Sequence, residues 1–157
     1  MKHNLIALPP NPHHDLAHRP GFLLRKAHQV AVAIFFEEVG KIALTPPQHN
    51  VLAAVQSHPG IHQTALALIV GYDRATVGAV LAGLEARALV RRIGTAADLR
   101  LKTIRITRGG STLLRSSAKA MDRINQRILQ CLEPNQQEAF IAMLAKIAFT
   151  MRQEAGE

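Results

Sequence analysis

The sequence predicts a mainly α-helical fold with one small β-hairpin, and three observations lead to this fold class. Apolar residues recur at helical spacing over most of the chain. Two short segments rich in β-branched residues, Leu89–Ile93 and Lys102–Ile106, are typical of strands, and the second alternates polar and apolar residues. The composition, 48% hydrophobic and 19% charged over 157 residues, suits one soluble helical domain with a real core.

The stretch from Ile61 to Gly110 indicates a helix-turn-helix followed by a hairpin wing. Ala67 permits close helix approach, Gly71 can adopt the positive φ of the turn, and Val77 packs the second helix on the first. The first of the two helices is expected over His62–Val70, and Asp73 can cap the second. Thr45 is expected to cap a helix that runs from Pro46 to about Ser57, and Thr107 a helix over Arg108–Leu132. Residues 94–98 form a turn-rich tip between the two strands, which predicts a β-hairpin.

Most of the excess positive charge lies in this stretch. It holds eight Lys or Arg against three acidic residues, in a chain with a formal net charge of +8 and a pI near 10.6. Such a concentration is typical of a surface that neutralises phosphates, so the predicted partner is nucleic acid before membrane.

An ordered series of motifs resembles the MarR family of bacterial, dimeric winged-helix regulators over about residues 20 to 152. The motifs are Leu44-Thr45-Pro46-Pro47-Gln48, Pro59-Gly60, Asp73-Arg74-Ala75-Thr76-Val77, Asp98-Leu99-Arg100 and Ile106-Thr107-Arg108-Gly109-Gly110. Two positions depart from the family pattern. Ala88 stands where Gly is frequent, and Leu99 stands where a basic residue is frequent. The resemblance implies that Arg100 enters the DNA minor groove and that Asp98 holds the hairpin.

The expected DNA contacts follow from the first turn of the second helix. Arg74 suits a bidentate contact to guanine or a contact to a phosphate. Thr76 could touch a thymine methyl or a phosphate, and Tyr72 a phosphate. The start of the preceding helix supplies Gln63 and Thr64 for phosphates. Basic residues alternate along the strands, so only some of them can face DNA; the candidate set is Gln63, Thr64, Tyr72, Arg74, Thr76, Arg91, Asp98 and Arg100.

The flanking segments predict a dimer. We divide the chain into an arm over residues 1–20 and a single domain over 21–157, with the winged helix-turn-helix at 44–107 and dimerisation helices at 21–43 and 108–154. The first long helix, expected over Phe22–Ile42, is apolar nearly all round. The last helix, expected to begin at Pro134, keeps an apolar stripe at intervals of four, three and four almost to its end. Pairing with a second copy would bury both; the alternative is a monomer that folds these helices back on itself.

Effector binding is a further expectation, because the resemblance implies small aromatic acids or phenols bound between the dimer helices and the winged part. Arg25 and His28 are three apart on one helix, and His49 lies on the helix that should cross it. Together with Phe22 they could hold a planar carboxylate. The other interpretation is an Arg25 salt bridge with partly buried packing histidines.

Several classes of function are excluded by residue type. The sequence has no phosphate loop, nucleophile elbow or metal-spaced Cys/His cluster, so we expect neither an enzyme nor a cofactor or metal, and we read the arm histidines as solvated. Prolines interrupt the uncharged run at residues 42–72, which argues against a membrane span and for a soluble, cytoplasmic protein. Cys131 is expected to be a buried packing residue.

The predicted function is a homodimeric, sequence-specific transcriptional regulator, a repressor released from an inverted-repeat operator by a small aromatic carboxylate or phenolic ligand. Two alternatives remain open at this point. One is a non-specific architectural DNA-binding protein, and the other is a winged-helix protein-interaction module. Repression rather than activation, the operator sequence and the effector are not determined by the residues themselves.

Overall fold

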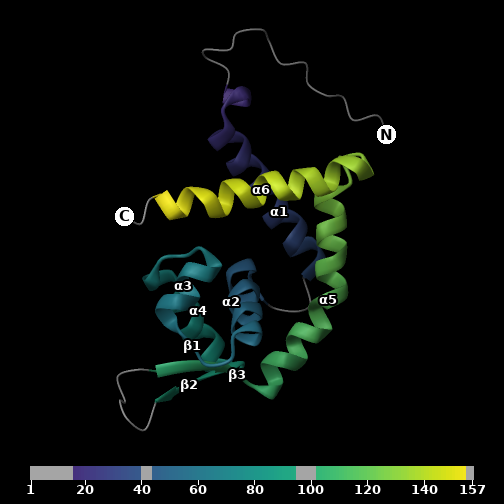
Figure 1. Cartoon of the computed structure of the whole chain (residues 1–157). Helices are drawn as coiled ribbons and strands as arrows, with labels where there is room; N and C mark the ends of the chain where they lie inside the picture. The colour runs from purple at the N-terminus through teal and green to yellow at the C-terminus, as the bar shows by residue number, and fades with distance from the viewer. Residues whose placement is uncertain (1–15, 40–43, 95–101, 155–157) are drawn as a thin grey trace.

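The computed structural model describes residues 16–39, 44–94 and 102–154, with side chains described as far as residue 149. Helices α1 and α6 lie at one end of the molecule and a winged part lies at the other, while α5 runs along the side from the winged part to α6 (Figure 1). In chain order they are η1 (Leu16–His18), α1 (Pro20–Val39), α2 (Pro46–Ser57), β1 (Ile61–His62), α3 (Gln63–Val70), α4 (Arg74–Ala86), β2 (Val90–Gly94), β3 (Lys102–Ile106), α5 (Arg108–Leu129) and α6 (Pro134–Glu154).

The winged part is built from α2, α3 and α4 packed on a three-stranded antiparallel sheet of order β1-β3-β2. Its core contains fully buried side chains from all three helices and from the central strand, among them Val51, Leu66, Val77 and Ile104. The strand β1 was not predicted, because two residues are too few to show an alternating pattern. His62, predicted as helical, belongs to this strand and precedes α3.

Three side-chain caps set the helix starts, as the sequence predicted. Thr45 and Gln48 form a reciprocal capping box at the start of α2, with Pro46 at the first helical position. Asp73 caps α4, and Thr107 caps α5 by accepting a hydrogen bond from the Gly110 backbone N–H at 3.1 Å. Each cap satisfies backbone donors that have no partner inside their own helix.

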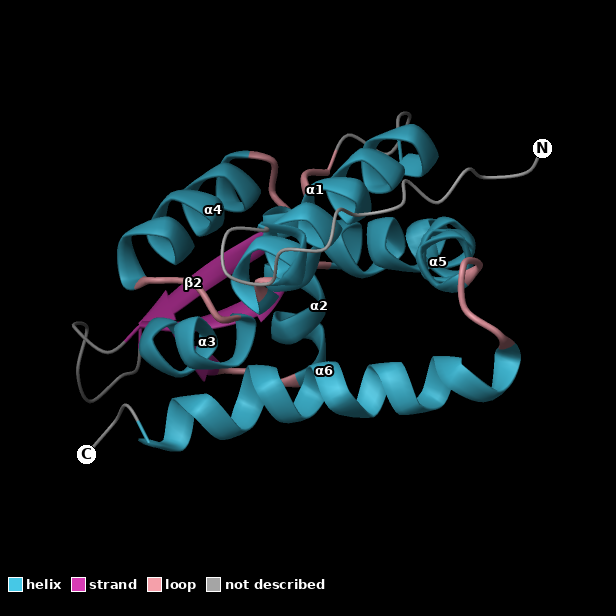
Figure 2. Ribbon diagram, turned by 90° about the horizontal axis from the view of Figure 1, so that it is seen from above, coloured by secondary structure: helices cyan, strands magenta, loops and turns pink. Residues whose placement is uncertain are grey.

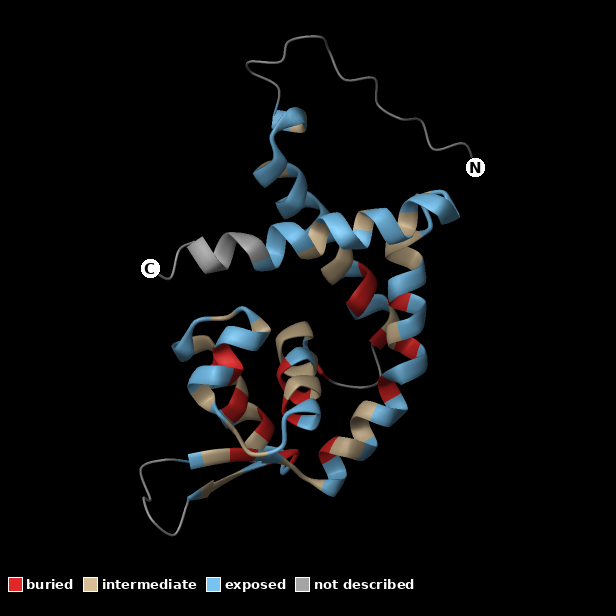
Figure 3. Cartoon of the chain, viewed as in Figure 1, coloured by how far each residue is buried: buried red, intermediate tan, exposed pale blue. Residues whose placement is uncertain are grey.

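A second core joins α1 to α5 above the winged part. The buried residues Ile34, Phe35 and Val39 of α1 pack against Ala120 and Ile124 of α5. Because α5 also packs on α2, it connects the winged part to α1 (Figure 3 shows buried residues in both places).

The ends of two helices differ from the prediction, as does one side chain. Helix α1 begins at Pro20 and α5 ends at Leu129 rather than Leu132. Cys131 is exposed, so the expected burial is wrong for the single chain. It lies in the turn that joins α5 to α6, and its thiol faces the Ile128 carbonyl at 3.8 Å. A turn at this point removes the apolar neighbours that a continued helix would have supplied.

Candidate DNA interface and effector cavity

The helix-turn-helix has the predicted internal geometry. Gly71 ends α3 in the left-handed conformation, with φ of 77°, and its N–H donates to the Ala67 carbonyl at 3.0 Å. Ala67 and Val77 are buried between the two helices, which lie at 105° to one another. No helix among the described residues is by itself long and apolar enough to cross a membrane. Helices α3 and α4 reach that length and hydropathy only together, across this sharp bend.

Asp73 organises the start of α4. One carboxylate oxygen accepts from the Thr76 backbone N–H and the other from the Thr76 hydroxyl, both at 2.7 Å. The hydrogen bond from the Thr76 side chain, followed by that from its backbone, holds the pKa of Asp73 below its usual value. The Thr76 hydroxyl is therefore engaged by the cap, which leaves its methyl group for contact with a base.

Arg74 is exposed on the first turn of α4, immediately after this cap. Thr64 is likewise exposed on the first turn of α3. Gln63 is half-buried, and its amide donates to the Arg74 carbonyl at 3.2 Å. Gln63 thus joins the start of α3 to the start of α4. This hydrogen bond holds the helix ends that carry the exposed Thr64 and Arg74 next to each other.

Tyr72 has a partner that the sequence did not indicate. The Asn50 side-chain amide of α2 donates to the Tyr72 hydroxyl at 3.3 Å, while the ring packs on the core of the winged part. Since the two residues are far apart in sequence, no local pattern could have shown the contact. Asn50 orients the turn before α4, and the Tyr72 hydroxyl keeps its own proton for donation to an acceptor such as a phosphate.

The basic residues of the hairpin lie on two different faces of the sheet. Arg92 is directed to α4, where its guanidinium meets the Glu85 carboxylate at 2.8 Å. Arg91 is exposed and stands directly opposite Arg105, which is also exposed. The remaining predicted wing contacts, Asp98 and Arg100, lie outside the described residues. In Figure 2, the hairpin lies at the same end of the molecule as α3 and α4.

The four residues predicted for an effector are distributed along the α1 and α2 helices. The Arg25 guanidinium lies over the Phe22 ring at 5.3 Å from its centroid, and Arg25 is exposed. His49 of α2 meets the Phe35 ring edge-on at 6.2 Å between centroids. Burial lowers the pKa of His49, and a hydrogen bond with Asn50 opposes that shift.

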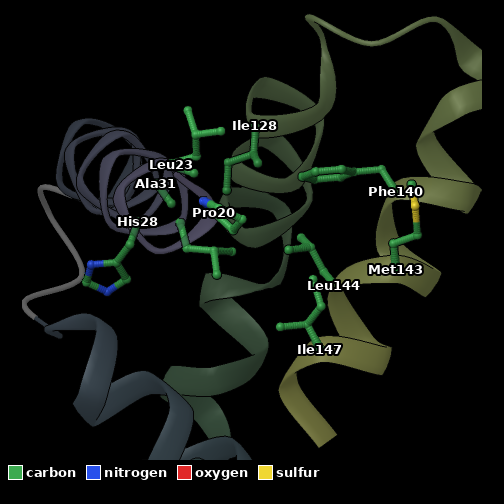
Figure 4. Close-up of a pocket in the computed structure, with 11 residues that line it drawn as sticks. Pro20, Leu23, His28, Ala31, Ile128, Phe140, Met143, Leu144 and Ile147 are labelled. Carbon is green, nitrogen blue, oxygen red and sulfur yellow. The ribbon is translucent and has the colours of Figure 1, made fainter. Parts of the chain in front are cut away.

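His28 lines an apolar cavity of about 600 Å³ between α1, α5 and α6. Figure 4 shows Phe140, Leu144 and Ile147 of α6 facing α1 across it. His28 supplies the one ionisable side chain of the lining, which otherwise consists of Pro20, Leu23, Leu24, Ala27, Ala31, Ile128, Phe140, Met143, Leu144 and Ile147. Arg25, Phe22 and His49 are not part of that lining, so the single chain does not bring the four predicted residues together.

Comparison with known proteins agrees with this architecture. The sequence pattern that describes the MarR family matches residues 44–101. The transcriptional regulator HosA of Escherichia coli is 35% identical over 107 residues, which is 68% of this chain and 79% of HosA.

Two solved structures are similar over nearly their whole length. BpsR of Bordetella bronchiseptica, whose DNA binding is regulated by 6-hydroxynicotinic acid, has a TM-score of 0.81 and 28% identity, covering 87% of this chain and 97% of BpsR. The repressor CouR of Rhodococcus jostii, solved on a 23-mer DNA duplex, has a TM-score of 0.79 and 30% identity, covering 86% of this chain and 96% of CouR. These proteins are transcriptional regulators rather than enzymes. The helix-turn-helix, the hairpin and the identity with HosA together place this chain in the MarR family of winged-helix transcriptional regulators.

Proposed function

We propose that this regulator is a homodimeric repressor of an inverted-repeat operator and that a small aromatic acid releases it. The observation that carries the DNA assignment is the exposed Arg74 on the capped first turn of α4, next to the turn that Gly71 closes. A side chain in this position of a recognition helix reaches base edges in the major groove.

Dimerisation is supported by the apolar residues that a single chain leaves exposed. No residue of α6 whose side chain is described is buried, and its Ile141, Met143, Ile147 and Phe149 are each more than half exposed. Leu23, Leu24 and Val30 of α1 are exposed as well. A two-fold partner that covers these helices would remove the apolar surface from water and would place two copies of α4 side by side.

The operator arrangement follows from that symmetry. Two recognition helices related by a two-fold axis read half-sites whose centres are about 10 bp apart, or a multiple of this spacing. Footprinting of the chain on upstream DNA should show a symmetric protected region with two such half-sites. Protection of one half-site at saturating protein would contradict the dimer.

Competition with unrelated DNA separates this proposal from a non-specific architectural DNA binder. A specific regulator should prefer its operator by at least ~10³-fold, whereas an architectural protein should show little preference. If the chain bound neither DNA, the protein-interaction module would be the better interpretation.

The role of Arg74 is tested by Arg74→Ala. Loss of a bidentate contact to guanine should weaken operator binding by about 1–3 kcal/mol and relax specificity at one base pair. The control is Arg115→Ala, which removes an exposed arginine of α5 that donates to Thr112 within its own helix. Equal affinity of the Arg74 variant and the wild type would remove Arg74 from the interface.

The effector proposal takes Arg25 as the anchor, with His28, three residues along α1, or His49 of α2 as the hydrogen-bonding group. In the single chain only His28 lines the cavity, so the proposal requires the ligand-bound dimer to bring these residues together. An arginine can neutralise a carboxylate bidentately, while an apolar wall accepts the ring and a histidine bonds a ring hydroxyl. The regulation of BpsR by 6-hydroxynicotinic acid supports a hydroxylated pyridine or benzene carboxylate as the chemical class. Such a ligand must favour the spacing of recognition helices that does not fit the operator, because equal affinity for both states shifts nothing.

Titration of the dimer–operator complex with a panel of aromatic acids, including 6-hydroxynicotinic acid, tests the effector class. A coupling of ~1–3 kcal/mol would weaken operator binding about 5- to 150-fold. Arg25→Ala should abolish this release, whereas Lys26→Ala, the loss of the adjacent exposed cation, should not. Release of both variants by the same acid would show that Arg25 is not the anchor.

A further inference from the structure

Two arginines face each other across the outer surface of the wing sheet. Arg91 of β2 and Arg105 of β3 are directly paired in the strand register, and both are exposed. Their side chains point away from the core, because the next residues on each strand, Val90, Arg92, Ile104 and Ile106, face the helices. The outer surface also carries Thr103, which pairs with His62 of β1 on one side and with Ile93 of β2 on the other.

This pair has no compensating acid among the residues that the structure describes. Arg92, one position along β2, is by contrast held by Glu85 at 2.8 Å. The Arg105 guanidinium extends toward β1, where a Cβ on Gly60 would lie 3.8 Å from Nη2. Like charges directly opposite on a sheet are destabilising, so the pair should lower the stability of the fold slightly. The described residues show no interaction of either arginine that would offset this repulsion. Such a cost points to a bound anion.

We propose that the outer sheet face, defined by Arg91, Arg105, His62 and Thr103, binds the phosphate backbone of DNA that flanks the operator. This inference rests on the proposed function, and it extends the DNA contact beyond the half-sites that α4 reads. Two guanidinium groups side by side match adjacent phosphates, and the His62 imidazole adds a hydrogen bond without sequence preference. The Thr103 hydroxyl already donates to the Ile93 carbonyl at 3.2 Å, so Thr103 contributes surface rather than a donor.

The chemistry of the face favours DNA over an acidic protein. The large hydrophobic residues that are exposed in the described chain lie on η1, α1, α3 and α6, and none of them is in the sheet. Protein–protein interfaces are organised around buried apolar or aromatic anchors. On the described part of this face the register places one apolar side chain, Ile93, which is already partly buried in the single chain. A polar, cationic surface without such an anchor is typical of a backbone contact to nucleic acid.

The position of the pair predicts that the flanking DNA bends. Arg91 precedes Gly94, the last described residue of β2, by three residues, or about 10 Å of strand. The two arginines lie on the sheet face opposite to Arg92, which meets Glu85 of α4, so a straight duplex seated on α4 would not reach them. Contact requires each flank to curve toward the sheet, a deformation that extra phosphate contacts can offset.

The experiment compares two duplexes that carry the footprinted operator. The short duplex ends at the limits of the inverted repeat, and the long one adds about 20 bp of random sequence on each side, roughly two helical turns. We expect the wild type to bind the long duplex more tightly. The double variant Arg91→Ala/Arg105→Ala should lose this gain, on the order of tenfold, with a salt slope smaller by about 0.9 for each phosphate contact removed.

Matched variants separate this contact from a general effect of charge. Arg115→Ala/Lys119→Ala removes two exposed cations from α5 and should retain the gain from the flanks. The double variant Arg91→Lys/Arg105→Lys keeps the charge and should therefore keep most of the affinity that the flanks add. Thermal melting of every variant checks folding, and a circular-permutation gel shift should show less bending with the double alanine variant.

Each of the other possible outcomes contradicts a specific part of this proposal. If flanks add no affinity for the wild type, or if the α5 control loses the gain equally, the outer sheet face does not bind flanking DNA. If the double alanine variant loses the same affinity on both duplexes, the pair lies within the half-site instead. Absence of specific binding to the short duplex by the wild type would contradict the proposed function itself, and with it this inference.

Discussion

Two adjacent glycines at the start of α5 have very different surroundings. A Cβ on Gly110 would collide with the Leu89 carbonyl oxygen and approach Ile106 Cγ1 to 2.7 Å. A Cβ on Gly109 would meet nothing closer than the Thr107 hydroxyl at 3.6 Å. The missing side chain of Gly110 is therefore what allows α5 to pack directly against the chain that enters β2.

Gly110→Ala should destabilise the protein by about 1–3 kcal/mol, because the backbone on both sides of the contact is held by the fold. Gly109→Ala, one residue away in the same helix, should be neutral or stabilising by up to about 1 kcal/mol, since alanine restricts the unfolded chain. Urea unfolding at one protein concentration measures both. A Gly110 variant as stable as the Gly109 variant would show that α5 can shift without loss.

Ala88 holds a backbone conformation that suits glycine. Its φ is 54°, in the left-handed region, where a Cβ meets the carbonyl group. Ala88→Gly should stabilise the fold by about 0.5–1 kcal/mol, while Ala82→Gly, at an exposed position inside α4, should destabilise it by a similar amount. Thermal melting should therefore show stability changes of opposite sign for the two variants. A loss of stability in both would contradict the strain at Ala88.

At the scale of elements, ion pairs hold α1 on α5. The Glu38 carboxylate accepts from Arg123 at 2.7 Å and from Arg127 at 3.0 Å, and Glu37 pairs with Arg127 at 2.6 Å. The Arg123 hydrogen bond, followed by that of Arg127, lowers the pKa of Glu38 in the folded protein. These contacts fix the end of α1 from which the chain continues to the winged part.

This arrangement predicts a loss of stability in acid. A carboxyl group whose pKa is lowered by folding contributes its full stabilisation above the unfolded pKa, about 4.3 for glutamate, and loses it as the pH falls through the folded value. Glu38→Gln should therefore be less stable than the wild type near neutral pH, and the difference should shrink below about pH 4. Glu138→Gln, on the exposed side of α6, is the control. A difference between Glu38→Gln and the wild type that stayed constant from neutral to acid pH would exclude this origin.

At the scale of the whole molecule, α6 extends across α1 above the winged part (Figure 1), and several of its apolar residues are exposed. Ile147 is half exposed, although it lines the cavity with α1. In the proposed dimer this side chain is buried, so its environment depends on the second copy.

Ile147→Asp should separate the dimer, because burial of an unpaired carboxylate costs about 3–5 kcal/mol. The adjacent Lys146→Asp places the same charge on an exposed position and should leave the dimer intact. Sedimentation equilibrium gives the oligomeric state, and operator affinity should fall with it. A monomeric wild type, or a dimeric Ile147→Asp, would contradict the proposed assembly.

The sequence by itself determined those features that depend on neighbours a few residues away. Asp73, Thr45 and Thr107 cap their helices through backbone groups three positions along, and Gly71 closes its turn through a carbonyl four positions back. Local steric and hydrogen-bonding rules suffice for such contacts. For the same reason the order of helices and the hairpin strand Lys102–Ile106 could be predicted from periodicity.

The tertiary structure decided how distant residues meet. The pairing of Ile61 with Ile104, the Asn50–Tyr72 hydrogen bond and the alignment of Arg91 with Arg105 join parts of the chain that no local pattern relates. The exposure of Cys131 and the separation of Arg25 from the cavity that His28 lines depend on where α6 crosses α1 and α5. Residue type and spacing place a side chain on a helix face, but the packing of one helix on another determines what that face meets.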